Sequence, residues 1–114
     1  MRKTLKVYEM VTRVDNVFYM VLRCYLPYLI LKVIMVKGSC TAYDIIKVIE
    51  QSFNYKFSSG TVYNILNVLE RRGYINRKLD APEITITSQG KALVLKALRE
   101  SETVTAKINA FLGD

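Results

Sequence analysis

The sequence contains no histidine and no tryptophan, and its 114 residues include only two cysteines, two prolines and five glycines. The lack of histidine excludes imidazole metal sites, Ser-His and Cys-His nucleophilic systems, and the usual general base near neutral pH. No metal-ligand cluster, glycine-rich phosphate loop or paired serine and base takes their place. We therefore expect a protein that is not an enzyme and that has no metal or cofactor.

The low proline and glycine content also argues against a disordered, collagen-like or loop-rich chain. A hydrophobic fraction of 51% is enough to fill the core of one small domain. Cys24 and Cys40 are too few for a disulfide scaffold and do not form a C-x-x-C motif. Two interpretations stay open for them: two reduced cytoplasmic thiols, or one oxidised pair within or between chains.

Acidic residues are the scarcer charge, with ten Asp and Glu against 17 Lys and Arg, which leaves a formal net charge of +7. This balance favours an acidic partner, with nucleic acid ahead of an anionic membrane. The stretch from Val17 to Val36 is apolar and long enough to cross a bilayer, but Arg23, Pro27 and Lys32 interrupt it. We expect no membrane association, no signal peptide and a cytoplasmic location.

Apolar residues between positions 4 and 25 recur every seven residues, as in a packed helix about three heptads long. The two main rows are Val7, Val14 and Val21, then Met10, Val17 and Cys24. An amphipathic helix lying on its own domain would give the same pattern. Because the rest of the chain forms a complete small domain by itself, we expect residues 1–25 to pack on a second copy of the chain.

Two more helices follow. Pro27 suits the first turn of a helix that ends at Gly38, so the sequence predicts two helices meeting near Leu26–Pro27. Thr41 and Asp44 then have the spacing of an N-cap residue and its N3 carboxylate. They predict a helix that continues to position 51.

The next helix is predicted over residues 59–72, with Ser58 or Ser59 as its N-cap and Gly73 as its terminator. After Gly73 the period changes to two, which predicts strands at 74–79 and 83–87. A hairpin of two strands is only marginally stable alone, so we expect it to pack against the helices. A last helix is predicted from about 89 to 112.

The resulting order is that of a winged helix-turn-helix, a mainly α fold with a small β-hairpin. We divide it into a dimerisation helix (1–25), a DNA-binding domain (26–90) and a C-terminal helix (91–114). Apolar residues continue along this last helix, and we expect Ile108 and Phe111 to contribute to the dimer interface.

The helix at 59–72 is the one to test for DNA contact, because the second helix of the motif enters the major groove. At 100° per residue, Asn64, Asn67 and Arg71 share the face opposite Val62, Leu66 and Leu69. Asparagine pairs with adenine and arginine with guanine, while free amides at a helix start suit a phosphate. Arg77 and Lys78, on the wing, are expected to meet phosphates. The predicted DNA-binding residues are Ser58, Ser59, Thr61, Tyr63, Asn64, Asn67, Arg71, Arg72, Arg77, Lys78 and Lys56.

Three segments, 43–47, 59–66 and 69–75, resemble the PadR family of winged-helix transcription regulators through the words G-T-V-Y and L-E-R-R-G-Y-I. MarR-type regulators and short winged-helix proteins of archaea and their viruses are similar in outline, which suggests an archaeal or viral source. The resemblance implies a dimer with recognition helices in successive major grooves and the wing, about 74–87, near the DNA backbone. It also implies that Ser59, Thr61, Tyr63, Asn64 and Asn67 point toward DNA.

The leading hypothesis is a homodimeric transcription regulator that binds double-stranded DNA sequence-specifically. The alternative is a winged-helix module that binds another protein and not DNA. No residue indicates which small-molecule effector, if any, would bind.

Overall fold

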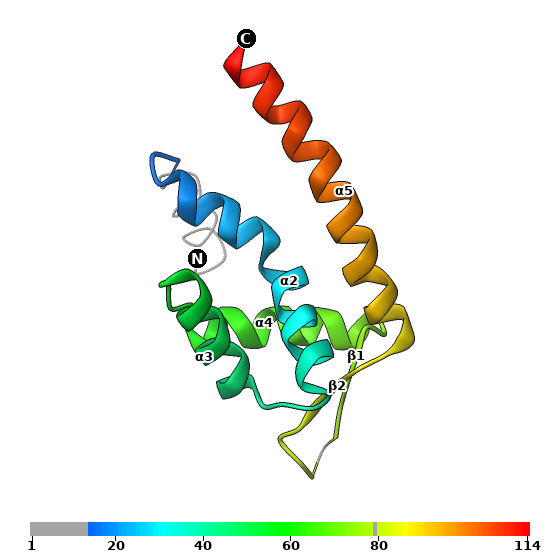
Figure 1. Cartoon of the computed structure of the whole chain (residues 1–114). Helices are drawn as coiled ribbons and strands as arrows, with labels where there is room; N and C mark the ends of the chain where they lie inside the picture. The colour runs from blue at the N-terminus through cyan, green and yellow to red at the C-terminus, as the bar shows by residue number, and fades with distance from the viewer. Residues whose placement is uncertain (1–13, 79) are drawn as a thin grey trace.

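The computed structural model describes residues 14–78 and 80–114, which form four helices and one two-stranded sheet (Figure 1). In chain order these are α2 (Val17–Lys37), α3 (Ala42–Phe53), α4 (Ser59–Arg71), β1 (Ile75–Arg77), β2 (Ile84–Ile86) and α5 (Ser88–Gly113). The predicted mainly helical fold with one hairpin is confirmed. Val7 and Met10, both predicted at a dimer interface, lie outside the described residues.

The helix α2 runs through Pro27, so the prediction of two helices meeting at Leu26–Pro27 is wrong. Proline cannot donate a backbone hydrogen bond, but the loss is confined to one turn. Figure 1 shows the axis of α2 changing direction near the middle of the helix. Leu22 and Leu26 before the proline and Ile30 after it are buried in one core, and this shared packing keeps the two halves in one helix.

Local capping sets where α3 begins, as the sequence predicts. The Asp44 backbone N–H donates to Thr41 Oγ1 at 3.2 Å, and the Thr41 N–H donates to Asp44 Oδ2 at 3.0 Å. The hydrogen bonds from Thr41 hold the pKa of the Asp44 carboxyl below its usual range. The capping box therefore gives hydrogen-bond acceptors to two backbone N–H groups that have none within the helix.

The two strands pair antiparallel, with Ile75 opposite Ile86 and Arg77 opposite Ile84. Both are shorter than predicted, because pairing stops before the turn that contains Pro82. Cys40 forms a bridge to β2 that the sequence did not predict. Its N–H donates to the Ile84 carbonyl at 3.1 Å, and its carbonyl accepts from the Ile84 N–H at 2.7 Å. The segment before α3 thus attaches the hairpin to the helical body, as the marginal stability of a lone hairpin requires.

The hairpin is also tied to the ends of α4 and α5. The Tyr74 N–H donates to the Leu69 carbonyl at 2.9 Å, and Thr87 Oγ1 donates to the Gly73 carbonyl at 2.7 Å. Gly73 has a φ of 81°, which favours glycine after the last turn of α4. At Gly90 an added Cβ would collide with the Tyr74 carbonyl oxygen, so only glycine allows α5 to start this close to the wing. The wing is therefore held in a defined position beside α4.

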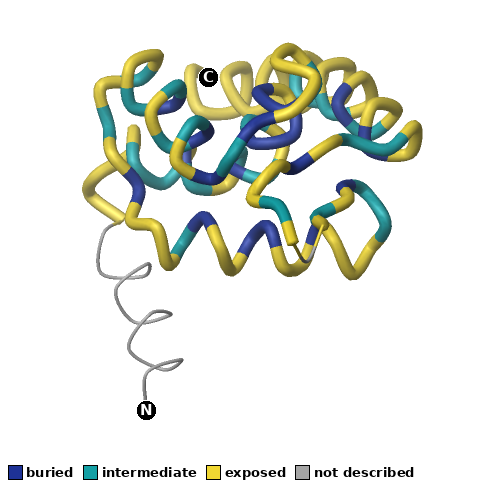
Figure 2. The backbone as a smooth tube through the Cα atoms, turned by 90° about the horizontal axis from the view of Figure 1, so that it is seen from below, coloured by how far each residue is buried: buried dark blue, intermediate teal, exposed yellow. Residues whose placement is uncertain are grey.

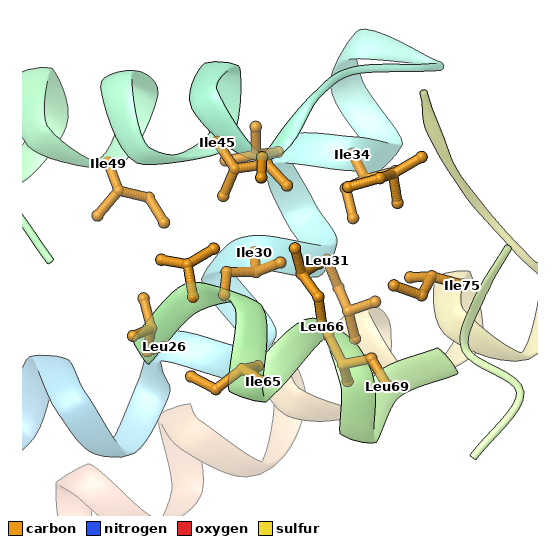
Figure 3. Packing of buried hydrophobic residues seen from close by; sticks show 14 of the residues in the cluster. Leu26, Ile30, Leu31, Ile34, Ile45, Ile49, Ile65, Leu66, Leu69 and Ile75 are labelled. Carbon is orange, nitrogen blue, oxygen red and sulfur yellow. The ribbon is translucent and has the colours of Figure 1, made fainter. Parts of the chain in front are cut away.

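One hydrophobic core joins α2, α3, α4 and the sheet, and Figure 3 shows side chains from each of these helices converging on it. Its fully buried members include Leu26, Ile30, Ile45, Leu66 and Ile75. No polar or charged residue is buried in the described part of the chain. Each helix of the motif is thus held by apolar packing, the dominant favourable term in folding.

The helix α2 is long and apolar enough, by length and composition alone, to cross a membrane. Six of its side chains are nevertheless buried in this core: Leu22, Leu26, Ile30, Leu31, Val33 and Ile34. A core helix of a folded domain passes the same test of length and composition. Packing within this chain covers only part of α2, however, because Val17, Val21 and Val36 remain exposed.

Both cysteines are free, which excludes a disulfide between Cys24 and Cys40 in this structure. Cys24 is exposed on α2, whereas Cys40 is buried, and this burial raises the pKa of the Cys40 thiol. Of the two interpretations of an oxidised pair, a disulfide between two chains stays a prediction.

Candidate nucleic-acid interface

The helix α4 has one apolar face and one polar face. Val62, Leu66 and Leu69, predicted to share the inner face, are all buried, and Ile65 joins them. Figure 3 shows Ile65, Leu66 and Leu69 pointing into the core. Asn64, Asn67 and Arg71 are exposed on the other side, as is Tyr63. Because α4 is packed along its full apolar face, it presents short amides and a guanidinium on a rigid support. Such groups can hydrogen-bond base edges in the major groove.

The start of α4 is open to solvent. Ser58 Oγ accepts from the Thr61 N–H at 3.2 Å, and the Ser58 and Thr61 hydroxyl oxygens lie 2.9 Å apart. Ser58 is therefore the N-cap, while Ser59 and Gly60 are exposed helical residues. Their N–H groups have no acceptor within the helix, which is the usual condition for binding an anion at a helix start. The Ser58 and Thr61 hydroxyls are partly engaged with each other, and Lys56 is exposed just before them.

The wing places Arg77 against α4. Arg77 Nε and Nη2 donate to Glu70 Oε1 at 3.1 and 2.7 Å, and Nη2 also donates to Asn67 Oδ1 at 2.6 Å. Glu70 was not predicted as part of the site. Its spacing of one helical turn from Asn67 is visible in the sequence, but its pairing with a wing residue depends on the tertiary fold.

The remaining predicted cations lie at the edges of the polar face. Arg71 and Arg72 end α4, Lys78 follows β1 and Lys56 precedes α4, and all four are exposed. Among the described residues none of the four forms a salt bridge, whereas the charge of Arg77 is matched by Glu70. The polar face of α4 therefore lies between unpaired positive charges, which attract the phosphates of a nucleic acid.

A second surface, on α2 and α5, is apolar. All the predicted interface residues that the structure describes are exposed: Val14, Val17, Val21, Cys24, Ile108 and Phe111. Phe111 is 85% exposed and Val17 is 67% exposed, which is unusual for such large apolar side chains. Phe18, Leu95, Leu98 and Val104 are also exposed and were not predicted there. Phe18 comes from α2, and the other three come from α5.

A groove of about 770 Å³ lies between α2 and α5. Cys24, Tyr25 and Tyr28 line it from α2, and residues between 93 and 107 line it from α5. Figure 1 shows α5 projecting away from the body, and Figure 2 shows its C-terminal part as exposed. Only Gly90 and Val94 of α5 are buried. The polar surface of α4 and the apolar surface of α2 and α5 thus offer contacts of opposite kinds.

The chain is similar to known transcription regulators in both sequence and structure. Residues 30–96, more than half of the chain, match the transcriptional regulator PadR-like family. A transcriptional regulator from Clostridium thermocellum is 27% identical with a TM-score of 0.71, over 80% of this chain and 93% of that one.

Two further solved structures share the fold. A PadR family regulator from Clostridium difficile is 22% identical with a TM-score of 0.65, over 77% of this chain and 98% of that one. Bordetella bronchiseptica BpsR, whose DNA binding is regulated by 6-hydroxynicotinic acid, is 20% identical with a TM-score of 0.59, over 73% of this chain and 58% of that one. No curated protein sequence matches the chain. The chain belongs to the PadR-like family, whose members are DNA-binding transcriptional regulators and not enzymes.

Proposed function

We propose that this protein is a homodimeric regulator that binds double-stranded DNA sequence-specifically, with α4 in the major groove and the wing beside the DNA backbone. The observation that carries the proposal is the exposed polar face of α4, with Asn64 and Asn67 at its centre and unpaired cations at its edges. Amide side chains on a packed helix suit base edges, and flanking cations suit phosphates.

Each predicted DNA-binding residue has a place in this arrangement. Asn64, Asn67 and Tyr63 would face the bases, with Arg71 at the far end of the same row. Ser58, Ser59 and Thr61 would bring the start of α4 to a phosphate. Lys56, Arg72 and Lys78 would add counter-charge along the backbone of the duplex. Arg77 was predicted as a further phosphate contact, but Glu70 and Asn67 already occupy its guanidinium.

We also infer that two copies associate through α2 and α5. Val17 and Val21 on α2 and Ile108 and Phe111 on α5 are large apolar side chains that this chain alone leaves exposed. A second copy packed there would remove them from water and would cover the groove between the two helices. Dimer symmetry would then set the spacing of the two recognition helices on DNA. A regulator of this kind acts in the cytoplasm, with no membrane partner.

The experiment is a selection of duplexes from a random pool by the purified full chain, followed by titration of the selected duplex and a random duplex at several salt concentrations. We expect tighter binding to the selected duplex and a steep loss of affinity with salt, because binding releases counterions. Binding to neither duplex would favour the alternative, a winged-helix module that binds protein. Equal binding to both would contradict sequence specificity.

A further inference from the structure

The Arg77 side chain links the wing to two side chains of the recognition helix. Its Nε and Nη2 donate to Glu70 Oε1, and Nη2 donates to Asn67 Oδ1 at 2.6 Å. Glu70 and Asn67 lie three residues apart on α4 and therefore on one side of the helix. A residue of β1 thus holds the side of α4 that carries the candidate base contacts.

This bond decides how the Asn67 amide is turned. A guanidinium has only donors, so Asn67 must direct its oxygen at Arg77 and its Nδ2 elsewhere. Asn67 is exposed, and its Nδ2 makes no hydrogen bond within the described residues. The amide therefore keeps a free donor for a ligand, while its oxygen is held toward Arg77 with one of its two lone pairs in use. Fixing the amide in advance also reduces the conformational entropy that binding costs.

The same contacts make Arg77 a poor candidate for a phosphate contact. Its side chain is 23% exposed and its charge is paired with Glu70 at 2.7 Å. Lys78, the next residue, is exposed and forms no salt bridge in the described part of the chain. The two neighbours are both basic, but only Lys78 carries an unmatched charge that can replace a counterion on DNA.

We propose that Arg77 is a positioning residue, which orients Asn67 so that its Nδ2 donates to an acceptor on a base edge in the major groove. The acceptors available there are purine N7, guanine O6 and thymine O4. Bidentate pairing with adenine, expected for a free asparagine, needs the amide oxygen to turn toward the base, and the hydrogen bond from Arg77 opposes this turn. This inference rests on the proposed function and names the residue that sets the specificity of one of its contacts.

The test compares Arg77→Ala, Asn67→Ala, the double variant and Lys78→Ala on the duplex that the wild-type protein selects and on a random duplex. We expect Arg77→Ala and Asn67→Ala to lose base preference at the same position, with discrimination falling about 5- to 100-fold. The double variant should lose no more than Asn67→Ala alone, because the two residues act as one unit. Lys78→Ala should weaken both duplexes alike and reduce the salt slope by about one unit.

Two further variants separate positioning from charge. Arg77→Ala leaves the Glu70 carboxylate unpaired, and this charge would repel any DNA, so the series is repeated in Glu70→Gln, which keeps an acceptor for Arg77 and removes the charge. Arg77→Lys keeps the positive charge but has no fork to reach both partners. We expect Arg77→Lys to lose base preference like Arg77→Ala, with the salt slope unchanged.

The inference is overturned if Arg77→Ala lowers the salt slope as Lys78→Ala does and keeps the base preference, since Arg77 then contacts phosphate. It is also overturned if Arg77→Lys restores full discrimination. If the wild-type protein selects no sequence, the proposed function is contradicted, and the inference about Arg77 falls with it. Circular dichroism of Arg77→Lys, which conserves the ion pair with Glu70, verifies that the wing and α4 remain folded.

Discussion

The helices α4 and α5 both have an apolar and a polar side, but the apolar side of α4 is buried and that of α5 is mostly exposed. In α4, Val62, Ile65, Leu66 and Leu69 are all buried within the chain. In α5, only Gly90 and Val94 are buried among 26 residues, and Phe111 is left 85% exposed. The difference shows that the domain buries the apolar face of α4 by itself but does not bury that of α5. In α4 only the polar face remains exposed, and it suits a charged partner. In α5 an apolar face remains exposed, and only contact with another apolar surface would remove it from water.

The largest effect is expected in the core behind α4. Leu66 is fully buried, so Leu66→Ala should lower the free energy of unfolding by about 2–5 kcal/mol, measured by urea denaturation. The control is Val36→Ala at a site 70% exposed on α2, which should change stability by less than about 0.5 kcal/mol. Equal losses of unfolding free energy for Leu66→Ala and Val36→Ala would contradict the conclusion that Leu66 is packed in the core and Val36 is not.

The next effect concerns the apolar side of α5. Replacing Ile108 and Phe111 together by Glu should weaken the dimer at least about 100-fold in Kd, because burying two carboxylates in an apolar interface is costly. Sedimentation equilibrium measures this change. Ala106→Glu adds charge on the opposite side of the same helix and should leave the dimer intact. A wild-type protein that sediments as a monomer would remove the inference that α5 pairs with a second copy.

A smaller effect is expected on the polar side of α4. Asn64→Ala should cost about 1–3 kcal/mol on the selected duplex and little on a random duplex, since a lost base contact affects only the cognate sequence. Fluorescence anisotropy titration of both duplexes measures the difference. Asn109→Ala, the same change on the exposed far end of α5, should alter neither. If Asn64→Ala leaves selective binding intact, α4 does not lie in the major groove as proposed.

The smallest effect comes from the capping box that starts the motif. The pKa of Asp44 is lowered in the folded chain by its hydrogen bonds from Thr41. The ionised carboxylate therefore stabilises the fold above the unfolded pKa of about 3.9, and this contribution is lost as pH falls through the lower folded value. Asp44→Asn should lower Tm at pH 7, and its difference from the wild type should shrink toward pH 3. Asp80→Asn should reproduce the wild-type profile, and a constant deficit for Asp44→Asn would contradict the assignment.

Much of the candidate site could be predicted because it depends on short-range geometry. The helical period alone places Val62, Leu66 and Leu69 on one face, and the structure buries all three. The same period places Asn64 and Asn67 opposite them, where they are exposed. Glu70 was missed because its partner, Arg77, lies across a turn and on another element. No local pattern indicates which residues two packed elements bring together.

The sequence by itself determined the features that depend on a few neighbouring residues. The Thr41–Asp44 box starts α3, and Gly38 and Gly73, with φ values of 83° and 81°, follow the last turns of α2 and α4. These are local because a cap, or a residue with positive φ, acts within one turn of chain. Tertiary structure decided the rest. Packing against one core carries α2 through Pro27, although a proline locally favours a helix end. It also sets Cys40 against Ile84 and Arg77 against Asn67, contacts whose formation requires the core to bring distant segments together.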